Sequence, residues 1–138
     1  MNRTIVDSVW VFLGCEFMPV LVVENNSDLA KIWASHLRRM GPWVDIAATA
    51  DEATDALIKK DYRVVVLDLD LPDGSALGLA DIISYRHPMC KVVLVTKSTF
   101  FSDGSIFRNM PNACGFLSKG TNPHDLAALV THHMPDQT

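Results

Sequence analysis

Hydrophobic residues follow two different periods along the chain from residue 19 onward. Continuous apolar, β-branched runs at residues 20–23, 64–67 and 92–95 are typical of strands buried on both faces. Two shorter predicted strands lie at 44–48 and 115–118. The segments between the strands place apolar residues at helical spacing, which predicts amphipathic helices.

Polar residues mark where several of these helices should begin. Asn26-Ser27 and Thr121-Asn122 are suited to N-caps, and Thr49 with Glu52 reads as a capping box. Residues 98–114 leave room for only about two helical turns, because glycine and proline interrupt them. Strands that alternate with helices predict an α/β fold with a doubly wound, five-stranded parallel sheet and helices on both faces. No G-x-G-x-x-G follows the first strand, so nothing supports dinucleotide binding.

Composition narrows the classes of function. The 138 residues suit one domain, and 49% hydrophobic with 20% charged residues excludes intrinsic disorder. A net charge of −4 argues against a sequence-independent nucleic-acid binder. Three widely spaced cysteines suggest free thiols in a reducing cytoplasm, not a disulfide framework or a zinc site. No apolar run reaches the roughly 18 residues of a membrane span. Because the cysteines suggest free thiols, we expect a cytoplasmic protein.

The N-terminal residues 1–17 are treated apart from the predicted domain at 18–138. Their apolar positions between 5 and 13 fall on one helical face, which favours a docking or dimer-forming extension. Met18 offers an alternative start of the chain. The run is too short and too interrupted by Asp7 for a signal peptide.

Polar side chains gather where the predicted strands end. In open α/β sheets the functional crevice lies at the carboxyl ends of the strands. If strands one, three, four and five are neighbours, six side chains should converge there: Glu24, Asn25, Asp68, Asp70, Thr96 and Lys119.

Carboxylates that share a pocket repel one another unless a cation joins them, and Mg²⁺ prefers oxygen ligands of this kind. A carboxylate beside a metal ion and an ammonium is suited to become an acyl phosphate. Lys119 would offset the developing charge, and the Thr96 hydroxyl could hydrogen-bond a phosphoryl oxygen.

Four segments in order resemble the receiver domain of bacterial two-component response regulators. They are Val-Leu-Val-Val-Glu at 20–24, Val-Val-Leu-Asp-Leu-Asp-Leu-Pro-Asp-Gly at 65–74, Val-Leu-Val-Thr at 93–96 and Gly-Phe-Leu-Ser-Lys at 115–119. The resemblance covers residues 19–134. It implies a flavodoxin-like sheet in strand order 2-1-3-4-5. It also implies a stand-alone switch that a histidine kinase or phosphotransfer protein phosphorylates and that a downstream protein target reads.

The resemblance also implies roles for individual residues. Asp68 matches the phosphoacceptor, Thr96 the switch hydroxyl and Lys119 the phosphate-pairing lysine. Phe116 matches the aromatic residue that changes rotamer on activation. The implied Mg²⁺ ligands come from four positions, with Asp70 contributing its backbone carbonyl: Glu24, Asn25, Asp68 and Asp70.

Three positions depart from the family pattern. Asn25 stands where a second acid is usual, so one negative charge is lost and Mg²⁺ affinity should fall. Lys97 follows the switch threonine in place of a small residue, where its cation could cover Asp68, pair with it or take over part of the metal's role. Gly120 replaces the proline that usually follows the lysine, which leaves that loop less constrained.

Other interpretations stay open. Asn25 is also a natural cap for the helix that begins near residue 28. Asn25 and Lys97 together suit a degenerate receiver that binds a partner protein without phosphorylation. Asp68-Leu69-Asp70 also resembles the nucleophile and general acid of haloacid-dehalogenase-type phosphatases, but that family needs a later acidic pair, for which residues 114–138 offer only Asp125 and Asp136.

Overall fold

The computed structural model describes residues 19–73, 75–97 and 110–134 of the 138-residue chain. The predicted extension at 1–17 and most of the segment predicted to hold two helical turns, residues 98–109, lie outside the described residues.

The described residues form an α/β sandwich with five strands and four helices. The strands are β1 (Val20–Val23), β2 (Val44–Ala47), β3 (Val64–Asp68), β4 (Lys91–Thr96) and β5 (Ala113–Ser118). The helices are α1 (Ser27–Arg39), α2 (Ala50–Lys59), α3 (Ala76–Arg86) and α5 (Pro123–His132).

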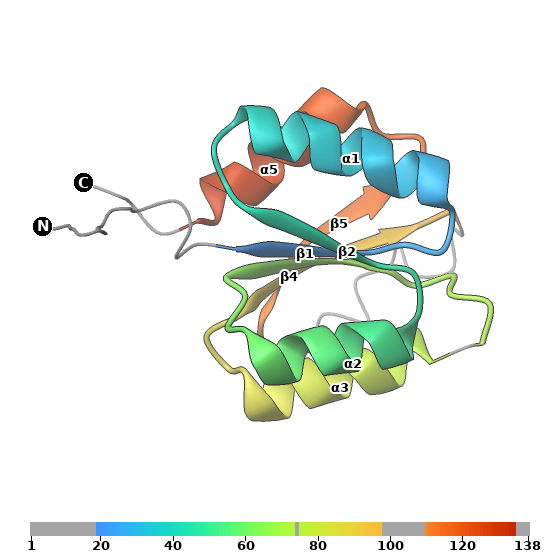
Figure 1. The fold of residues 1–138 in the computed structure, drawn as a ribbon, viewed down its shortest axis with the longest axis vertical. Coiled ribbons are helices and arrows are strands. Elements are labelled where there is room, and N and C mark those ends of the chain that lie inside the picture. The colour runs from blue at the N-terminus through green and yellow to red at the C-terminus, as the bar shows by residue number, and fades with distance from the viewer. Residues whose placement is uncertain (1–18, 74, 98–109, 135–138) are drawn as a thin grey trace, which may run out of the picture.

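All neighbouring strands pair in parallel, in the order β2-β1-β3-β4-β5. Helices α1 and α5 cover one face of the sheet, and α2 and α3 cover the other (Figure 1). The predicted fold class, strand order and placement of helices on both faces are therefore confirmed. Since every strand runs in the same direction, the five carboxyl ends meet at one edge of the sheet.

Alternate residues of the central strands feed two separate cores, because successive side chains in a strand point to opposite faces. Leu21, Val65 and Leu67 pack with α2 and α3, whereas Val22 and Val66 pack with α1 and α5. Trp33 of α1, only 1% exposed, fills the second core. This two-sided burial explains why the strands read as continuous apolar runs.

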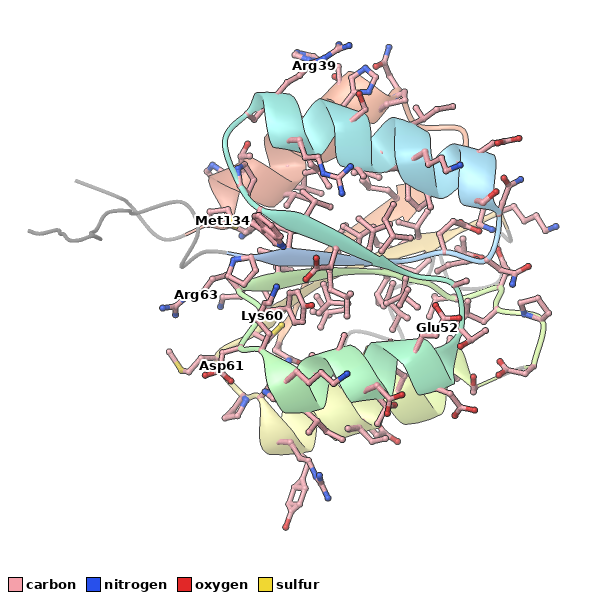
Figure 2. The ribbon with its side chains drawn as sticks, in the orientation of Figure 1. Arg39, Glu52, Lys60, Asp61, Arg63 and Met134 are labelled. Carbon is pink, nitrogen blue, oxygen red and sulfur yellow. The ribbon has the colours of Figure 1, made fainter. Side chains whose placement is uncertain are left out.

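The helix starts agree with the predicted caps. The Asn26 side chain accepts hydrogen bonds from the Asp28 and Leu29 amides, and Asn122 accepts one from the His124 amide. The Thr49 hydroxyl accepts from the Glu52 amide, while Glu52 accepts from the Ala48 amide in return. Glu52 lies at the end of α2 nearest the carboxyl edge of the sheet, and Lys60, Asp61 and Arg63 lie at the opposite end (Figure 2).

The fifth strand is longer than the sequence predicts. It begins at Ala113 instead of Gly115, and its pairing with β4 shifts between Val92 and Val93, so that Cys114 is the extra residue of a bulge. Asn112 anchors this start, because its side chain donates to the Cys90 carbonyl at 2.8 Å and accepts from the Ser84 hydroxyl at 2.6 Å. Periodicity misses the bulge because the extra residue breaks the alternation.

None of the described helices has the length and hydrophobicity needed to cross a membrane.

Candidate functional site

Asp68 is the last residue of β3 and lies at the centre of the carboxyl edge of the sheet. It is only 1% exposed. One carboxylate oxygen, Oδ1, accepts a hydrogen bond from the Asp70 amide at 2.8 Å. The other, Oδ2, accepts from the Lys119 ammonium at 3.0 Å. The carboxylate is therefore held by two donors, one neutral and one charged.

Glu24 follows β1, the strand beside β3, and is also 1% exposed. Its Oε2 accepts from the Asn26 amide at 2.9 Å, and Oε1 lies 3.2 Å from Lys119 Nζ as an ion pair outside hydrogen-bond geometry. Burial raises the pKa of Glu24. The nearby charge of Asp68 raises it further, while the Asn26 amide and Lys119 act in the opposite direction.

Lys119 follows β5 and bridges the two buried carboxylates, with its side chain 18% exposed. Burial alone would lower the pKa of this ammonium, but the hydrogen bond to Asp68 and the charges of Asp68 and Glu24 outweigh burial, so the pKa is raised. The Lys119 amide donates to the Thr96 carbonyl at 3.1 Å, which ties the lysine to the end of β4. The cation that the carboxylates require is therefore present within the chain.

Asp70 turns its side chain toward the end of β4. Both of its carboxylate oxygens lie 3.0 Å from the hydroxyl of Thr96, which donates to them. The Lys97 amide donates to Asp70 Oδ2 at 2.8 Å. Thr96 is buried at 2% exposure, whereas Lys97 is exposed. Asp68 and Thr96 are thus linked through one intervening residue, by the backbone of Asp70 on one side and its carboxylate on the other.

Asn25 lies apart from this set of contacts. It is exposed, and its amide nitrogen donates to the Ala48 carbonyl at a long 3.4 Å. With Thr49, Leu71 and other residues it lines a small pocket of about 90 Å³. The alternative interpretation of Asn25 as a helix cap is wrong, because the cap of α1 is Asn26.

The remaining predicted positions lie around the same edge. Phe116 of β5 is half-buried and packs against the core under α2 and α3. The Gly120 amide donates to Ser118 Oγ at 3.1 Å, a bond that proline could not make. Among the described residues, the ammonium that reaches Asp68 is that of Lys119, and the contact that Lys97 makes with this site runs through its backbone.

The donor set fits a divalent cation by its chemistry. The carboxylates of Glu24 and Asp68, the Asn25 amide oxygen and the Asp70 carbonyl are oxygen donors of the kind that Mg²⁺ prefers. Glu24, Asp68 and Asp70 together carry more negative charge than the Lys119 ammonium offsets. No group of three or more acidic, histidine or cysteine side chains in the described part of the chain is arranged to hold a metal.

Two features of the site escape the sequence analysis. The Asn26 amide as a partner of Glu24 follows from the turn that begins α1. For Asp70 the sequence predicts a role of the backbone carbonyl alone. In the structure its side-chain carboxylate also accepts hydrogen bonds, from Thr96 and Lys97. The sequence signal for this contact is that Asp70 closely follows the predicted third strand and Thr96 ends the fourth, and these strands pair in the structure.

Comparison with known proteins gives a consistent result. The model of the response regulator receiver domain family matches residues 20–131. The response regulator protein PilR of Pseudomonas aeruginosa is 31% identical over 109 residues, which are 79% of this chain and 24% of PilR. Regulatory protein LuxO of Vibrio vulnificus is 27% identical over 75 residues, which are 54% of this chain and 17% of LuxO. The chain thus spans a quarter or less of the length of these relatives.

Solved structures share the fold. A CheY-like receiver domain protein from Methanospirillum hungatei superposes with a TM-score of 0.77 at 23% identity, covering 85% of this chain and 93% of that chain. The Thermotoga maritima response regulator TrrA, solved in complex with Mg²⁺ and beryllofluoride, gives a TM-score of 0.73 at 22% identity, covering 84% of this chain and 98% of that one.

Proposed function

This chain belongs to the response regulator receiver domain family, and from that premise we propose that it is a phosphoacceptor switch whose phosphorylated residue is Asp68. The donor would be the phosphohistidine of a histidine kinase or of a phosphotransfer protein, and the output would be binding to a downstream protein. We assign the protein to the cytoplasm and include self-association among its interactions. The observation that carries the proposal is the Lys119 ammonium, 3.0 Å from Asp68 and 3.2 Å from Glu24.

In phosphoryl transfer the protein contributes mainly the positioning of the reacting groups and electrostatic stabilisation. An oxygen of Asp68 forms the new bond to phosphorus, and the phosphorus–nitrogen bond to the donor's imidazole breaks, with its electron pair staying on nitrogen. That nitrogen then takes a proton from solvent. Lys119 already lies on Asp68 Oδ2 and offsets the charge that the phosphoryl group brings.

Four positions would hold the metal ion that receiver domains generally use at this site. They are the positions that match the family's metal ligands: Glu24, Asn25, Asp68 and the Asp70 carbonyl. When bound, Mg²⁺ would supply positive charge beside the transferring phosphoryl group. With an amide in place of a carboxylate at position 25, we expect weaker binding of the ion than two adjacent acids would give.

The signal would pass along β4 and β5. Thr96 and Phe116 lie on these adjacent, paired strands, and Thr96 carries the hydroxyl that could donate to a phosphoryl oxygen. Movement of these two residues would change the surface around β5, where a partner protein can read it. This mechanism requires no catalytic turnover by the chain itself.

Intact mass spectrometry tests the proposal directly. The protein is incubated with acetyl phosphate or phosphoramidate, with Mg²⁺ or with EDTA. One added phosphoryl group that requires Mg²⁺ and is lost in Asp68→Asn is the expected result. Asp81→Asn, which changes an exposed aspartate on α3, is the matched control and should label as the natural protein does. Labelling that persists in Asp68→Asn would refute Asp68 as the phosphoacceptor.

Two other functions remain as alternatives. If no donor labels the protein while a known receiver labels in parallel, the degenerate receiver that binds a partner without phosphorylation is favoured by the exposed, uncharged Asn25. The haloacid-dehalogenase-type phosphatase would need Asp70 as a general acid. Its carboxylate accepts from Thr96 and Lys97, which argues against that role. Sustained release of phosphate from a phosphomonoester would revive it.

A further inference from the structure

Asp70 forms the direct link between the phosphoacceptor and the predicted switch residue. Its amide donates to Asp68 Oδ1 at 2.8 Å, so its backbone is fixed against the carboxylate that receives the phosphoryl group. Its side chain accepts from the Thr96 hydroxyl, with 3.0 Å to each oxygen, and from the Lys97 amide at 2.8 Å. Hydrogen bonds to an ionised acceptor are roughly twice as strong as neutral ones.

The Asp70 carboxylate therefore accepts hydrogen bonds from two donors at the end of β4. This strand lies beside β3, which carries Asp68. The hydroxyl of Thr96 is the group that would donate to a phosphoryl oxygen on Asp68. A phosphoryl group carries about −1.5 to −2 charge at neutral pH and presents three strong acceptor oxygens. It would attract the same hydroxyl and the same amide, and it would repel the carboxylate that holds them.

We propose that the Asp70 side chain is a positioning residue that holds Thr96 and Lys97 in the resting arrangement, so that a phosphoryl group on Asp68 must take these donors from Asp70 before the switch moves. The inference rests on the proposed phosphorylation of Asp68. It assigns to the side chain of Asp70 a role separate from that of its backbone carbonyl, which a substitution of the side chain leaves in place. Asp70 would thus set how far the resting protein is biased toward the inactive state.

Competition of this kind predicts the effect of removing the carboxylate. In Asp70→Asn and Asp70→Ala, beryllofluoride with Mg²⁺, a mimic of the phosphoryl group, should bind with an apparent Kd about fivefold to tenfold lower than in the natural protein. Asp73→Asn removes the same charge from an exposed residue of the same loop and is the matched control, with a change below about twofold.

A double substitution separates the hydrogen bond from the charge. If Asp70 acts through the Thr96 hydroxyl, at least half of the gain from Asp70→Asn should disappear in a Thr96→Val background. If only the lost negative charge matters, the full gain should persist in that background, and this result would overturn the proposal.

A second measurement needs no phosphoryl group and keeps the two proposals distinguishable. Amide NMR and hydrogen exchange of the metal-free protein should show the Lys97 amide proton shifted upfield and less protected in both Asp70 variants, with Asp73→Asn unchanged. An unaffected Lys97 amide would show that Asp70 does not hold Lys97 in the resting state. This result would overturn the proposal whether or not Asp68 is phosphorylated. An affected amide with unchanged beryllofluoride affinity overturns the competition while Asp68 remains the phosphoacceptor.

If Asp70→Asn binds the mimic and the natural protein does not, the proposal is supported in its strongest form. If no variant binds it while acetyl phosphate still labels Asp68, the competition fails and the proposed function stands.

Discussion

Lys119 Nζ lies 3.2 Å from Glu24 Oε1 while it donates to Asp68 at 3.0 Å, so one ammonium contacts two carboxylates that are each 1% exposed. Three strands contribute to this arrangement, because Glu24 follows β1, Asp68 ends β3 and Lys119 follows β5. Removing one partner of a buried ion pair leaves an uncompensated buried charge. The lysine is therefore expected to stabilise the fold as well as to serve the chemistry.

The first prediction concerns this lysine. Lys119→Met should lower the free energy of unfolding by about 3 kcal/mol at pH 7 in EDTA, measured by urea denaturation. The pKa of Glu24 is raised from its ordinary value of 4.5, so the folded state binds more protons than the unfolded state just above that pH. Ionisation of Glu24 thus costs stability as the pH rises, and the loss in Lys119→Met should be larger at pH 8 than at pH 5.

A second substitution checks the cause. In Glu24→Gln/Lys119→Met only one of the two carboxylates remains, so at least half of the lost stability should return. A double variant no more stable than Lys119→Met alone would show that the packing of the lysine side chain, and not charge, accounts for the loss.

The second prediction concerns Asp45 on the edge strand β2. Its carboxylate accepts from Trp43 Nε1 at 2.8 Å, Lys60 Nζ at 2.9 Å and the Tyr62 hydroxyl at 2.6 Å. Burial alone would raise the pKa of Asp45, but these hydrogen bonds outweigh it and the pKa is lowered from 3.8. The unfolded state therefore binds more protons as the pH falls, and the stability that Asp45 contributes is present above pH 3.8 and lost below it.

Asp45→Asn should accordingly cost about 1 kcal/mol of unfolding free energy at pH 7, because both Asp45 and Lys60 are partly exposed. The difference from the natural protein should shrink toward pH 3. Urea denaturation at both pH values measures it, and Asp81→Asn, an exposed aspartate on α3, is the control. An equal deficit at pH 3 would mean that the ionised carboxylate is not the stabilising form.

The sequence predicts the fold well because local and long-range signals agree. Buried β-branched runs define the central strands, and side-chain caps at Asn26, Thr49 and Asn122 define three helix starts. The position of Asp68 at the carboxyl edge also follows, since parallel strands bring their ends together.

Side-chain directions at the site could not be predicted in the same way. Whether Asp70 faces the acceptor or the switch depends on the turn after β3 and on the amide of Lys97, and no periodicity encodes either. Asn25 and Asn26 are chemically identical neighbours, and only the backbone path decides which one caps α1. The bulge at Cys114 likewise arises from pairing with β4 and not from local sequence.

The third prediction uses the close packing of β5 against α5. A Cβ atom on Gly115 would lie 2.7 Å from Leu129 Cδ2, closer than side-chain carbons approach. Gly115→Val should therefore lower the unfolding free energy by about 1–3 kcal/mol. In a Leu129→Ala background the added cost of Gly115→Val should fall by more than half, measured by thermal or urea unfolding.

Gly78 provides the matched control. It lies within α3, and a Cβ atom there would meet nothing within 4 Å. Gly78→Ala should stabilise the protein by about 0.5–1 kcal/mol, because alanine loses less conformational entropy in a helix than glycine does. If Gly115→Val were as well tolerated as Gly78→Ala, the contact with Leu129 would not limit residue 115.

The fourth prediction concerns the missing acid at position 25. Asn25→Asp adds a carboxylate to the predicted ligand set, so the Mg²⁺ concentration that gives half-maximal labelling with acetyl phosphate should fall about tenfold. Asn26→Asp makes the same chemical change one residue along and keeps a good helix cap, so it should shift the half-maximum by less than about twofold.

Lys97→Ala should steepen the Mg²⁺ dependence if the exposed lysine cation takes over part of the metal's role. Unchanged titrations in both Asn25→Asp and Lys97→Ala would show that neither departure from the family pattern weakens the metal site, and equal shifts in Asn25→Asp and Asn26→Asp would point to general charge instead of a ligand.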